Sequence, residues 1–129
     1  MPGTVIKENR IFRRLYSKGK HQVHPLLVTY VQRNREGQTR YGISASKKIG
    51  CAVERNRAKR VIRAAYREVE GEITGSWDFI FVARSRTTRV KMNEVKKVME
   101  RQIKALTAEN GKSGKEKRKI EDQSEKQDR

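Results

Sequence analysis

Hydrophobic residues in two segments recur every three or four positions, which is the spacing of an amphipathic helix. The first segment runs from about Glu8 to Lys18, with Asn9 as a candidate N-cap and Gly19 as a stop signal. The second runs from about Lys91 to Leu106. Both are predicted to be helices that turn one apolar stripe to a core. The stripes consist of Ile11, Phe12, Leu15 and Tyr16 in the first helix and of Met92, Val95, Met99, Ile103 and Leu106 in the second.

Between these helices lie segments with the composition of strands. The chain from about His21 to Gln32 is predicted to be extended, and Pro25 divides it into two strands. A turn follows at Asn34–Gln38, and then a third strand at Tyr41–Ala45. The fourth strand, Trp77–Ala83, is almost continuously apolar, which is typical of a central strand covered on both faces.

A third helix, beginning near Gly50, separates apolar from cationic residues by their direction around its axis. At 100° per residue the apolar positions fall on one side and the cationic positions on the other. Glu54 and Glu68 lie near its ends. The apolar side holds Ala58, Val61, Ile62, Ala65 and Val69, and the opposite side holds Asn56, Arg60, Arg63 and Arg67, flanked by Arg57 and Lys59.

The predicted order is therefore α-β-β-β-α-β-α, an α+β sandwich in which helices cover a four-stranded mixed sheet. Residues 1–107 are predicted to form a single domain. Residues 108–129 hold seven basic and six acidic side chains, and Ile120 is their only large apolar residue. This tail is predicted to be disordered because it has too little apolar surface to bury.

Charge narrows the choice of partner. The formal net charge is +17, from 32 Lys and Arg against 15 Asp and Glu. Since the tail contributes only +1, residues 1–107 carry +16. A folded surface with this field favours a polyanion, with nucleic acid ahead of an anionic membrane surface.

The cationic helix is the strongest candidate for the contact. Like charges four residues apart destabilise a helix by about a few tenths of a kcal/mol per pair, and Lys59, Arg63 and Arg67 form such pairs. A phosphate backbone would offset that cost because each contact releases condensed counterions. We therefore predict that this face docks on nucleic acid. The alternative is a solvated charged surface, although such surfaces usually mix signs.

Other kinds of chemistry find little support in the sequence. Cys51 is the only cysteine, so no internal disulfide is possible, and His21 and His24 are too few to complete a zinc site. Asp78 stands alone in a strand, so no carboxylate pair for acid–base catalysis is evident. No apolar run is long enough to cross a membrane. We expect a cytoplasmic protein with no metal site.

The segment KKIGCAVERNRAKRVIRAAYRE, Lys47–Glu68, resembles the signature helix of the protein subunit of bacterial ribonuclease P. It includes the triplet Arg55-Asn56-Arg57, which names the family motif. The resemblance covers residues 7–106, with the Phe12 and Tyr16 helix, the Tyr30 strand, GISASKKIG and DFIFVAR in the same order. The family commonly has Asn where this chain has Cys51, so Cys51 is left off the RNA-binding residues and is interpreted as a small residue near the helix start.

The resemblance implies a function without catalytic residues in this chain. In the family, the RNA subunit hydrolyses precursor tRNA at the 5′ end of the mature sequence with Mg²⁺, which RNA and substrate chiefly bind. The small protein binds the ribonuclease P RNA and the precursor tRNA, which broadens substrate use and raises Mg²⁺ affinity, and no other protein partner is obligatory. The resemblance also implies a left-handed crossover between the third and fourth strands, whereas general rules favour a right-handed one.

The resemblance implies two groups of site residues. Rings in a cleft would stack on unpaired bases of the 5′ leader while lysines follow its phosphates; without the resemblance, aromatic residues four apart on a helix are more often core. The contact with catalytic RNA is assigned to Arg55, Asn56, Arg57, Lys59 and Arg60, extended along the same face to Arg63 and Arg67. The leader cleft is assigned to Phe12, Tyr16, Tyr30, Ser46, Lys47 and Lys48.

Two alternatives remain open at this point, and a third is disfavoured. A basic ribosomal or double-stranded RNA-binding protein shares the leading α-β-β-β-α order but would end after its second helix. A redox-responsive thiol at Cys51 beside Lys47 and Lys48 is another. A cationic protein at a membrane surface needs a larger apolar helix face than this chain offers.

Overall fold

The computed structural model describes residues 4–108, and it confirms the predicted α+β order with one added strand. The added strand is a two-residue segment at the start, too short to show a periodicity. The predicted disordered tail lies outside the described residues, except for Ala108. The elements are β1 (Thr4–Val5), α1 (Asn9–Lys18), β2 (Lys20–His24), β3 (Leu27–Arg33), β4 (Arg40–Ser44), α2 (Ala52–Val69), β5 (Trp77–Ala83) and α3 (Met92–Thr107), with short 3-10 turns η1 (Lys47–Ile49), η2 (Glu70–Glu72) and η3 (Ser85–Arg89).

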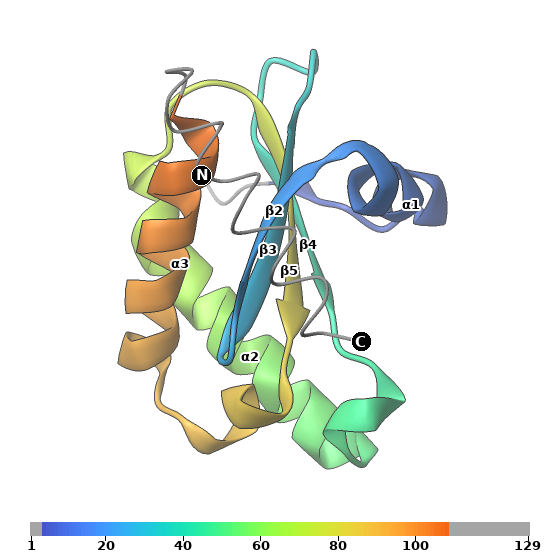
Figure 1. Cartoon of the computed structure of the whole chain (residues 1–129), viewed down its shortest axis with the longest axis vertical. Coiled ribbons are helices and arrows are strands. Elements are labelled where there is room, and N and C mark those ends of the chain that lie inside the picture. Colours follow the sequence, from blue (N-terminus) through green and yellow to red (C-terminus); the bar gives the residue numbers. More distant parts are fainter. Residues whose placement is uncertain (1–3, 109–129) are drawn as a thin grey trace.

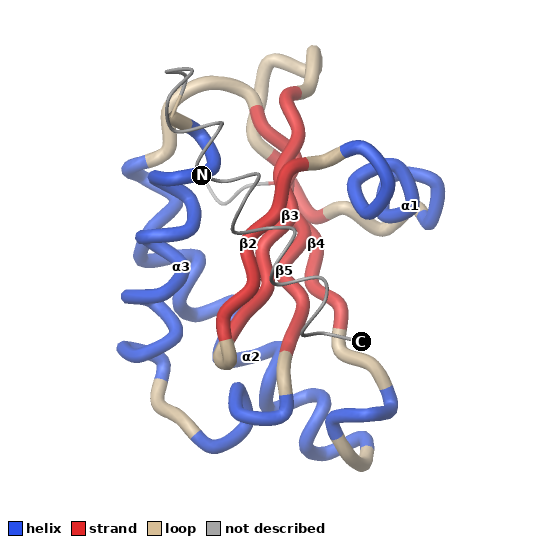
Figure 2. The backbone as a smooth tube through the Cα atoms, in the orientation of Figure 1, coloured by secondary structure: helices blue, strands red, loops and turns tan. Residues whose placement is uncertain are grey.

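The strands form one mixed sheet in the order β1-β4-β5-β3-β2 (Figure 2). β5 lies in the middle, antiparallel to β3 and parallel to β4. The parallel β4–β5 connection passes through α2, which confirms the predicted crossover; its left-handed sense stays a prediction from the resemblance. β2 and β3 pair as a hairpin around Pro25, where the sequence predicted a break.

Helices cover both faces of the sheet: α2 and α3 lie on one side and α1 on the other (Figure 1). β5 shows why its sequence is continuously apolar. Phe79 and Phe81 belong to the core under α2 and α3, whereas Ile80 belongs to a second core under α1 with Ile11 and Leu15. The prediction of a central strand covered on both faces is confirmed.

The apolar side of α2 faces the larger core as predicted. Ala58, Ile62, Ala65 and Val69 are buried, and Val61 is half-buried. Helix periodicity did not single out Tyr66, which is also buried and stacks on Tyr41 with ring centroids 4.3 Å apart. Burial raises the pKa of the Tyr66 hydroxyl, so this ring is a neutral core residue.

The predicted N-cap of the first helix is wrong by one position. Glu8, not Asn9, occupies the N-cap position, and its side chain makes no cap hydrogen bond. Its carboxylate instead accepts a hydrogen bond from Arg10 Nε at 2.7 Å. Asn9 is already the first helical residue, so its side chain comes one position too late to cap.

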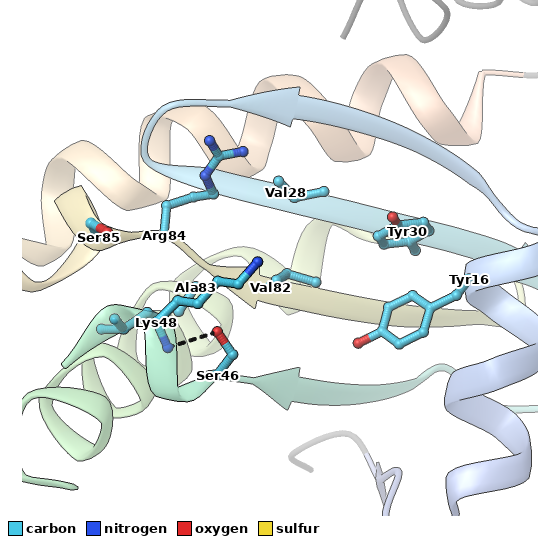
Figure 3. A pocket seen from close by; sticks show the side chains of 10 residues that line it. Tyr16, Val28, Tyr30, Ser46, Lys48, Val82, Ala83, Arg84 and Ser85 are labelled. Atoms are coloured by element: carbon cyan, nitrogen blue, oxygen red, sulfur yellow. Dashed lines mark hydrogen bonds between the residues drawn. The ribbon is translucent and has the colours of Figure 1, made fainter. Parts of the chain in front are cut away.

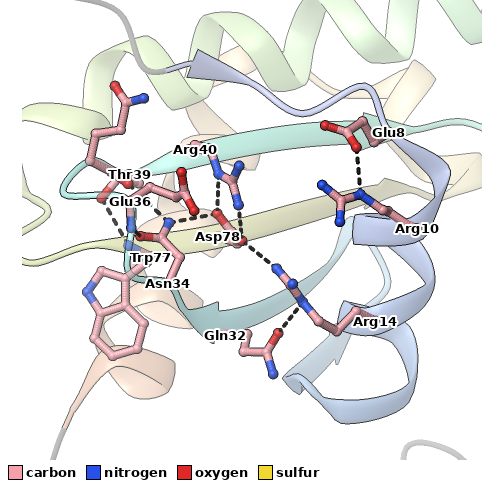
Figure 4. Close-up of polar contacts among 11 residues, drawn as sticks. Glu8, Arg10, Arg14, Gln32, Asn34, Glu36, Thr39, Arg40, Trp77 and Asp78 are labelled. Carbon is pink, nitrogen blue, oxygen red and sulfur yellow. Dashed lines mark hydrogen bonds and ion pairs between the residues drawn. The ribbon is translucent and has the colours of Figure 1, made fainter.

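A buried carboxylate ties several elements together beneath α1 (Figure 4). Asp78 on β5 has a fully buried side chain. Arg40 of β4 donates to both of its oxygens, through Nε and Nη2, at 2.8 Å each. Asn34 Nδ2 donates at 2.7 Å and Arg14 Nη2 of α1 at 3.2 Å. The hydrogen bond to Asp78 raises the pKa of Arg40, so the guanidinium stays charged. The bidentate contact joins β4 to β5, and Arg14 adds α1.

Replacing Asp78 tests whether these buried contacts stabilise the fold. Asp78→Asn keeps the shape but leaves the Arg40 guanidinium without its counter-charge in a mostly buried place, so the free energy of unfolding should fall by about 3–5 kcal/mol. Denaturant unfolding followed by circular dichroism measures it. Glu8→Gln, in the exposed Glu8–Arg10 pair, is the control and should leave the midpoint almost unchanged. A similar midpoint for both variants would contradict the assignment.

Candidate nucleic-acid interface

The loop before α2 fixes where the cationic helix begins. Gly50 has φ 147°, a conformation that favours glycine, and a Cβ there would overlap the Glu54 carboxylate. That carboxylate accepts hydrogen bonds from the Cys51 backbone N–H at 3.3 Å and from its thiol at 3.6 Å. Cys51 therefore occupies the N-cap position of α2, as the sequence analysis expected for a small residue near the helix start. Arg55 Nη1 donates to the Gly50 carbonyl at 3.2 Å and closes the turn.

The outer side of α2 is an exposed cationic surface, which we call the arginine face: Arg57, Arg60, Arg63 and Arg67. Within residues 4–108 no hydrogen bond or ion pair holds any of these four side chains. The two acidic residues of α2 are engaged elsewhere, Glu54 at the cap and Glu68 with Lys96 of α3 at 3.8 Å. The face therefore keeps its positive charge.

The other predicted site residues of α2 differ in exposure and in what they contact. Asn56 is exposed beside it. Arg55 is half-buried because its guanidinium packs on the loop at Gly50. Lys59 is half-buried and lines a hollow together with Phe12.

That hollow is one of two that share Tyr16 and together form what we call the aromatic groove. The Phe12 hollow, of about 720 Å³, lies between α1 and β4 and is lined by Ile6, Lys7, Asn9, Phe12, Arg13, Tyr16, Ile43, Ser44, Ala45 and Lys59. The Tyr30 hollow, of about 510 Å³, is lined by Tyr16, Val28, Tyr30, Ser46, Lys48, Ile49, Val82, Ala83, Arg84 and Ser85 (Figure 3). Both volumes fall in the range of about 300–1,000 Å³ typical of ligand sites.

The rings of the groove form a connected row. Phe12 and Tyr16 meet edge to face with centroids 6.3 Å apart, and Tyr16 meets Tyr30 in the same way at 4.9 Å. Tyr30 stacks in turn on the buried His21 at 4.9 Å. Only Tyr16 is largely exposed, at 41%. Tyr16 is therefore the ring with the most surface for a base, and its half-buried neighbours support it.

Gly42 makes room for this row on the sheet. A Cβ at this position would lie 2.7 Å from Cζ of Phe12 and 3.0 Å from Cδ1 of Ile80. Only glycine lets the Phe12 ring lie this close to β4. Packing under an aromatic ring thus explains the glycine of the segment GISAS.

Cations border both hollows, and no carboxylate is among the residues that line them. Lys48 and Arg84 reach into the Tyr30 hollow from opposite sides (Figure 3). Ser46 holds the turn that carries Lys48, because its Oγ accepts the Lys48 backbone N–H at 3.3 Å. An anionic chain lying along the row of rings would meet positive charge on both sides of the groove.

Most of the predicted cleft residues come together in the structure. Tyr16, Tyr30, Ser46 and Lys48 share one hollow, and Phe12 lines the other. Lys47 is exposed in η1 but lines neither hollow. Six polar residues of the lining were not predicted from the sequence: Lys7, Asn9, Arg13, Ser44, Arg84 and Ser85. Two of them lie in motifs that carry the resemblance, Ser44 in GISASKKIG and Arg84 in DFIFVAR.

The described residues offer no group of three or more His, Cys, Asp or Glu side chains that would hold a metal ion. His24 Nδ1 accepts the Leu26 backbone N–H at 3.0 Å, and burial, together with the charge of Arg101, lowers the pKa of His24. Asp78 is occupied by Arg40, Asn34 and Arg14. Among the helices of the described residues, none is both long and apolar enough to cross a membrane.

The fold, the arginine face and the aromatic groove together define an RNA-binding protein of the α+β class. The family model of ribonuclease P matches residues 3–107. The ribonuclease P protein component of Clostridioides difficile is 34% identical over 100 residues, which cover 77% of this chain and 88% of that protein. That of Shouchella clausii is 39% identical over 101 residues, covering 77% and 82%.

Solved structures agree with the sequence matches. The RNase P protein of Staphylococcus aureus superposes with a TM-score of 0.71 at 33% identity, covering 84% of this chain and all of that one. The Thermotoga maritima RNase P protein has the same fold, with a TM-score of 0.71 at 24% identity over 80% of this chain and 97% of that one. The chain belongs to the ribonuclease P protein family.

Membership confirms the predicted family and the coarse function, a protein component of the endoribonuclease that processes tRNA 5′ ends. It also decides against the ribosomal or double-stranded RNA-binding alternative. The structure gives the physical reason, because β5 lies in the middle of the sheet between β3 and β4. A domain that ended after α2 would lack its central strand.

Proposed function

We propose that this chain binds the ribonuclease P RNA through the arginine face and the single-stranded 5′ leader of precursor tRNA through the aromatic groove. The observation that supports this pairing most directly is the position of Lys59, which comes from α2 yet lines the Phe12 hollow. α2 therefore contributes side chains to both surfaces. An RNA docked on the arginine face would hold its catalytic core beside the groove.

The arginine face suits a structured RNA. Its side chains are exposed and unpaired within the described residues, so no internal ion pair has to be broken on binding. Each guanidinium offers a planar fork of donors that matches phosphate oxygens. The buried side of α2 holds these charges in place before contact, which lowers the entropic cost of association.

The aromatic groove suits unpaired nucleotides of any sequence. Stacking on an aromatic ring is worth about 1–3 kcal/mol per base and hardly depends on the base. Tyr16 presents the accessible ring, and Lys48 and Arg84 lie where phosphates of the same strand would pass. This chemistry fits a leader that differs from one precursor to the next.

Hydrolysis is assigned to the RNA subunit with Mg²⁺. Mg²⁺ prefers oxygen ligands, usually one or two carboxylates, whereas the groove is lined by lysine, arginine, serine and apolar residues. These residues do not fit a Mg²⁺ site of the protein. The chain would raise Mg²⁺ affinity indirectly, by neutralising phosphates that otherwise repel one another, and would position the scissile phosphate by clamping the leader.

The proposed partners are ribonuclease P RNA and precursor tRNA, with no obligatory protein partner, in the bacterial cytoplasm. Both RNA contacts are built entirely from residues of this one chain.

Tyr16 tests the groove. Tyr16→Leu removes the exposed ring, so the holoenzyme should bind leader-bearing precursor roughly 5- to 100-fold more weakly, while its affinity for mature tRNA stays unchanged. Tyr16→Phe keeps the ring and is the matched control. Equilibrium binding of both RNAs measures the difference. Phe12→Ala should act in the same direction, and equal losses for precursor and mature tRNA would return these rings to a purely structural role.

Arg60 and Arg63 test the arginine face. For Arg60→Ala/Arg63→Ala, affinity for the catalytic RNA should fall and the slope of log K against log[salt] should drop by about 1 per lost phosphate contact. Arg35→Ala/Lys104→Ala removes equal charge from exposed positions off α2 and serves as the control. An unchanged slope in the α2 variant would exclude this face as the contact.

A further inference from the structure

We propose that η3, together with Arg84 and Lys91, is a third RNA contact that binds phosphates of leader nucleotides beyond the aromatic groove. Affinity for precursor tRNA should then rise with leader length after the groove itself is filled. This inference rests on the proposed function, since it extends the path of the same strand.

The charge of this segment is unmixed. Arg84, Arg86, Arg89 and Lys91 fall within eight residues, and no acidic residue occurs between Asp78 and Glu94. Arg86, Arg89 and Lys91 are exposed. Neither Arg86 nor Arg89 has a side-chain hydrogen bond or ion pair within residues 4–108, so both side chains are available to a ligand.

The backbone that carries these charges is held rigidly by a buried threonine. Thr87 is fully buried, and its hydroxyl donates to the Leu26 carbonyl at 2.7 Å while accepting the Arg84 backbone N–H at 2.9 Å. The Thr87 N–H donates back to the Arg84 carbonyl at 2.9 Å. Thr88 Oγ1 closes the turn by donating to the Ser85 carbonyl at 2.9 Å. A charged loop that is already ordered loses little conformational entropy on binding.

The segment continues directly from the groove. Arg84 and Ser85 line the Tyr30 hollow at the end away from Tyr16 and Tyr30 (Figure 3). Ser85 is also the first residue of η3. A strand stacked on Tyr16 that leaves the hollow past Ser85 would therefore run onto Arg86 and Arg89. This continuity favours the leader over a separate RNA or an acidic protein as the occupant.

The test uses the holoenzyme assembled from this chain and a bacterial ribonuclease P RNA. Its dissociation constants are measured for mature tRNA and for precursors with leaders of increasing length. In the wild type, affinity should continue to rise after the leader is long enough to fill the groove. Arg86→Ala/Arg89→Ala should abolish that late increment, a loss of roughly tenfold for the longest leader, with no loss for the shortest leader or for mature tRNA.

The salt dependence gives a second readout. With a long leader, the slope of log K against log[salt] should fall by roughly 1.4, because a single strand gives about 0.7 per phosphate contact. Arg86→Lys/Arg89→Lys keeps the charge and should retain most of the late increment. Arg35→Ala/Lys104→Ala is the charge-matched control, because Arg35 lies in the turn between β3 and β4 and Lys104 in the last turn of α3. Both of these segments lie at the opposite end of the molecule from η3 (Figure 1). Circular dichroism confirms that each variant is folded.

Three results would overturn the inference. If the η3 variant matches the wild type at every leader length, η3 does not bind the leader. If it weakens all RNAs equally, including mature tRNA, η3 contacts another part of the complex. If the wild type itself binds precursor no better than mature tRNA, the groove assignment fails and this extension fails with it, so the two failures are distinguishable.

Discussion

The apolar side of α2 holds a row of like charges at fixed positions against their mutual repulsion. Ala58, Ile62, Ala65 and Val69 are buried against the sheet and α3, and Tyr66 adds a stacked aromatic ring. In an isolated helix the arginines of the opposite side would be unfavourable neighbours. The core therefore stabilises a row of positive charges that suits a negatively charged partner. RNA is such a partner, because its phosphates carry negative charge at a regular spacing.

The sheet carries the second surface because β5 is buried on both of its faces. Phe79 and Phe81 anchor α2 and α3 on one side, and Ile80 anchors α1 on the other. Asp78 adds a charged link from β5 to Arg40 and Arg14. These contacts fix α1 on the sheet, and the aromatic groove lies beside α1, with Lys59 of α2 among its lining residues. The protein thus holds the two proposed RNA contacts in one rigid frame.

Much of this architecture was predictable from local patterns. The period of the α2 stripe predicted its buried side, and the unbroken apolar run of β5 predicted a central strand. The resemblance predicted the family, and it also predicted that Phe12, Tyr16 and Tyr30 line a cleft. In the structure these three rings form one connected row. Periodicity alone would have assigned these rings to the core, and indeed Phe12 and Tyr30 are half-buried.

The remaining features depend on contacts between distant segments, which no local pattern reports. Lys59 lies on the flank of a helical wheel, and only the position of α1 makes that flank part of the groove. Arg84 becomes a groove residue because Thr87 bonds to Leu26, 61 positions away in the chain. Asp78 stands isolated in the sequence, yet it binds three partners from separate elements. Glu8 rather than Asn9 is the N-cap because the helix begins one residue earlier than a cap at Asn9 would require.

The most direct test of the central idea, that a rigid cationic protein assists a catalytic RNA, is cleavage at low Mg²⁺. The chain is mixed with a bacterial ribonuclease P RNA and precursor tRNA, and release of the 5′ leader is measured against a nonspecific basic protein of equal charge. The wild type should stimulate cleavage well beyond that control. Equal stimulation by the control, or cleavage by the chain without any RNA subunit, would contradict the proposal.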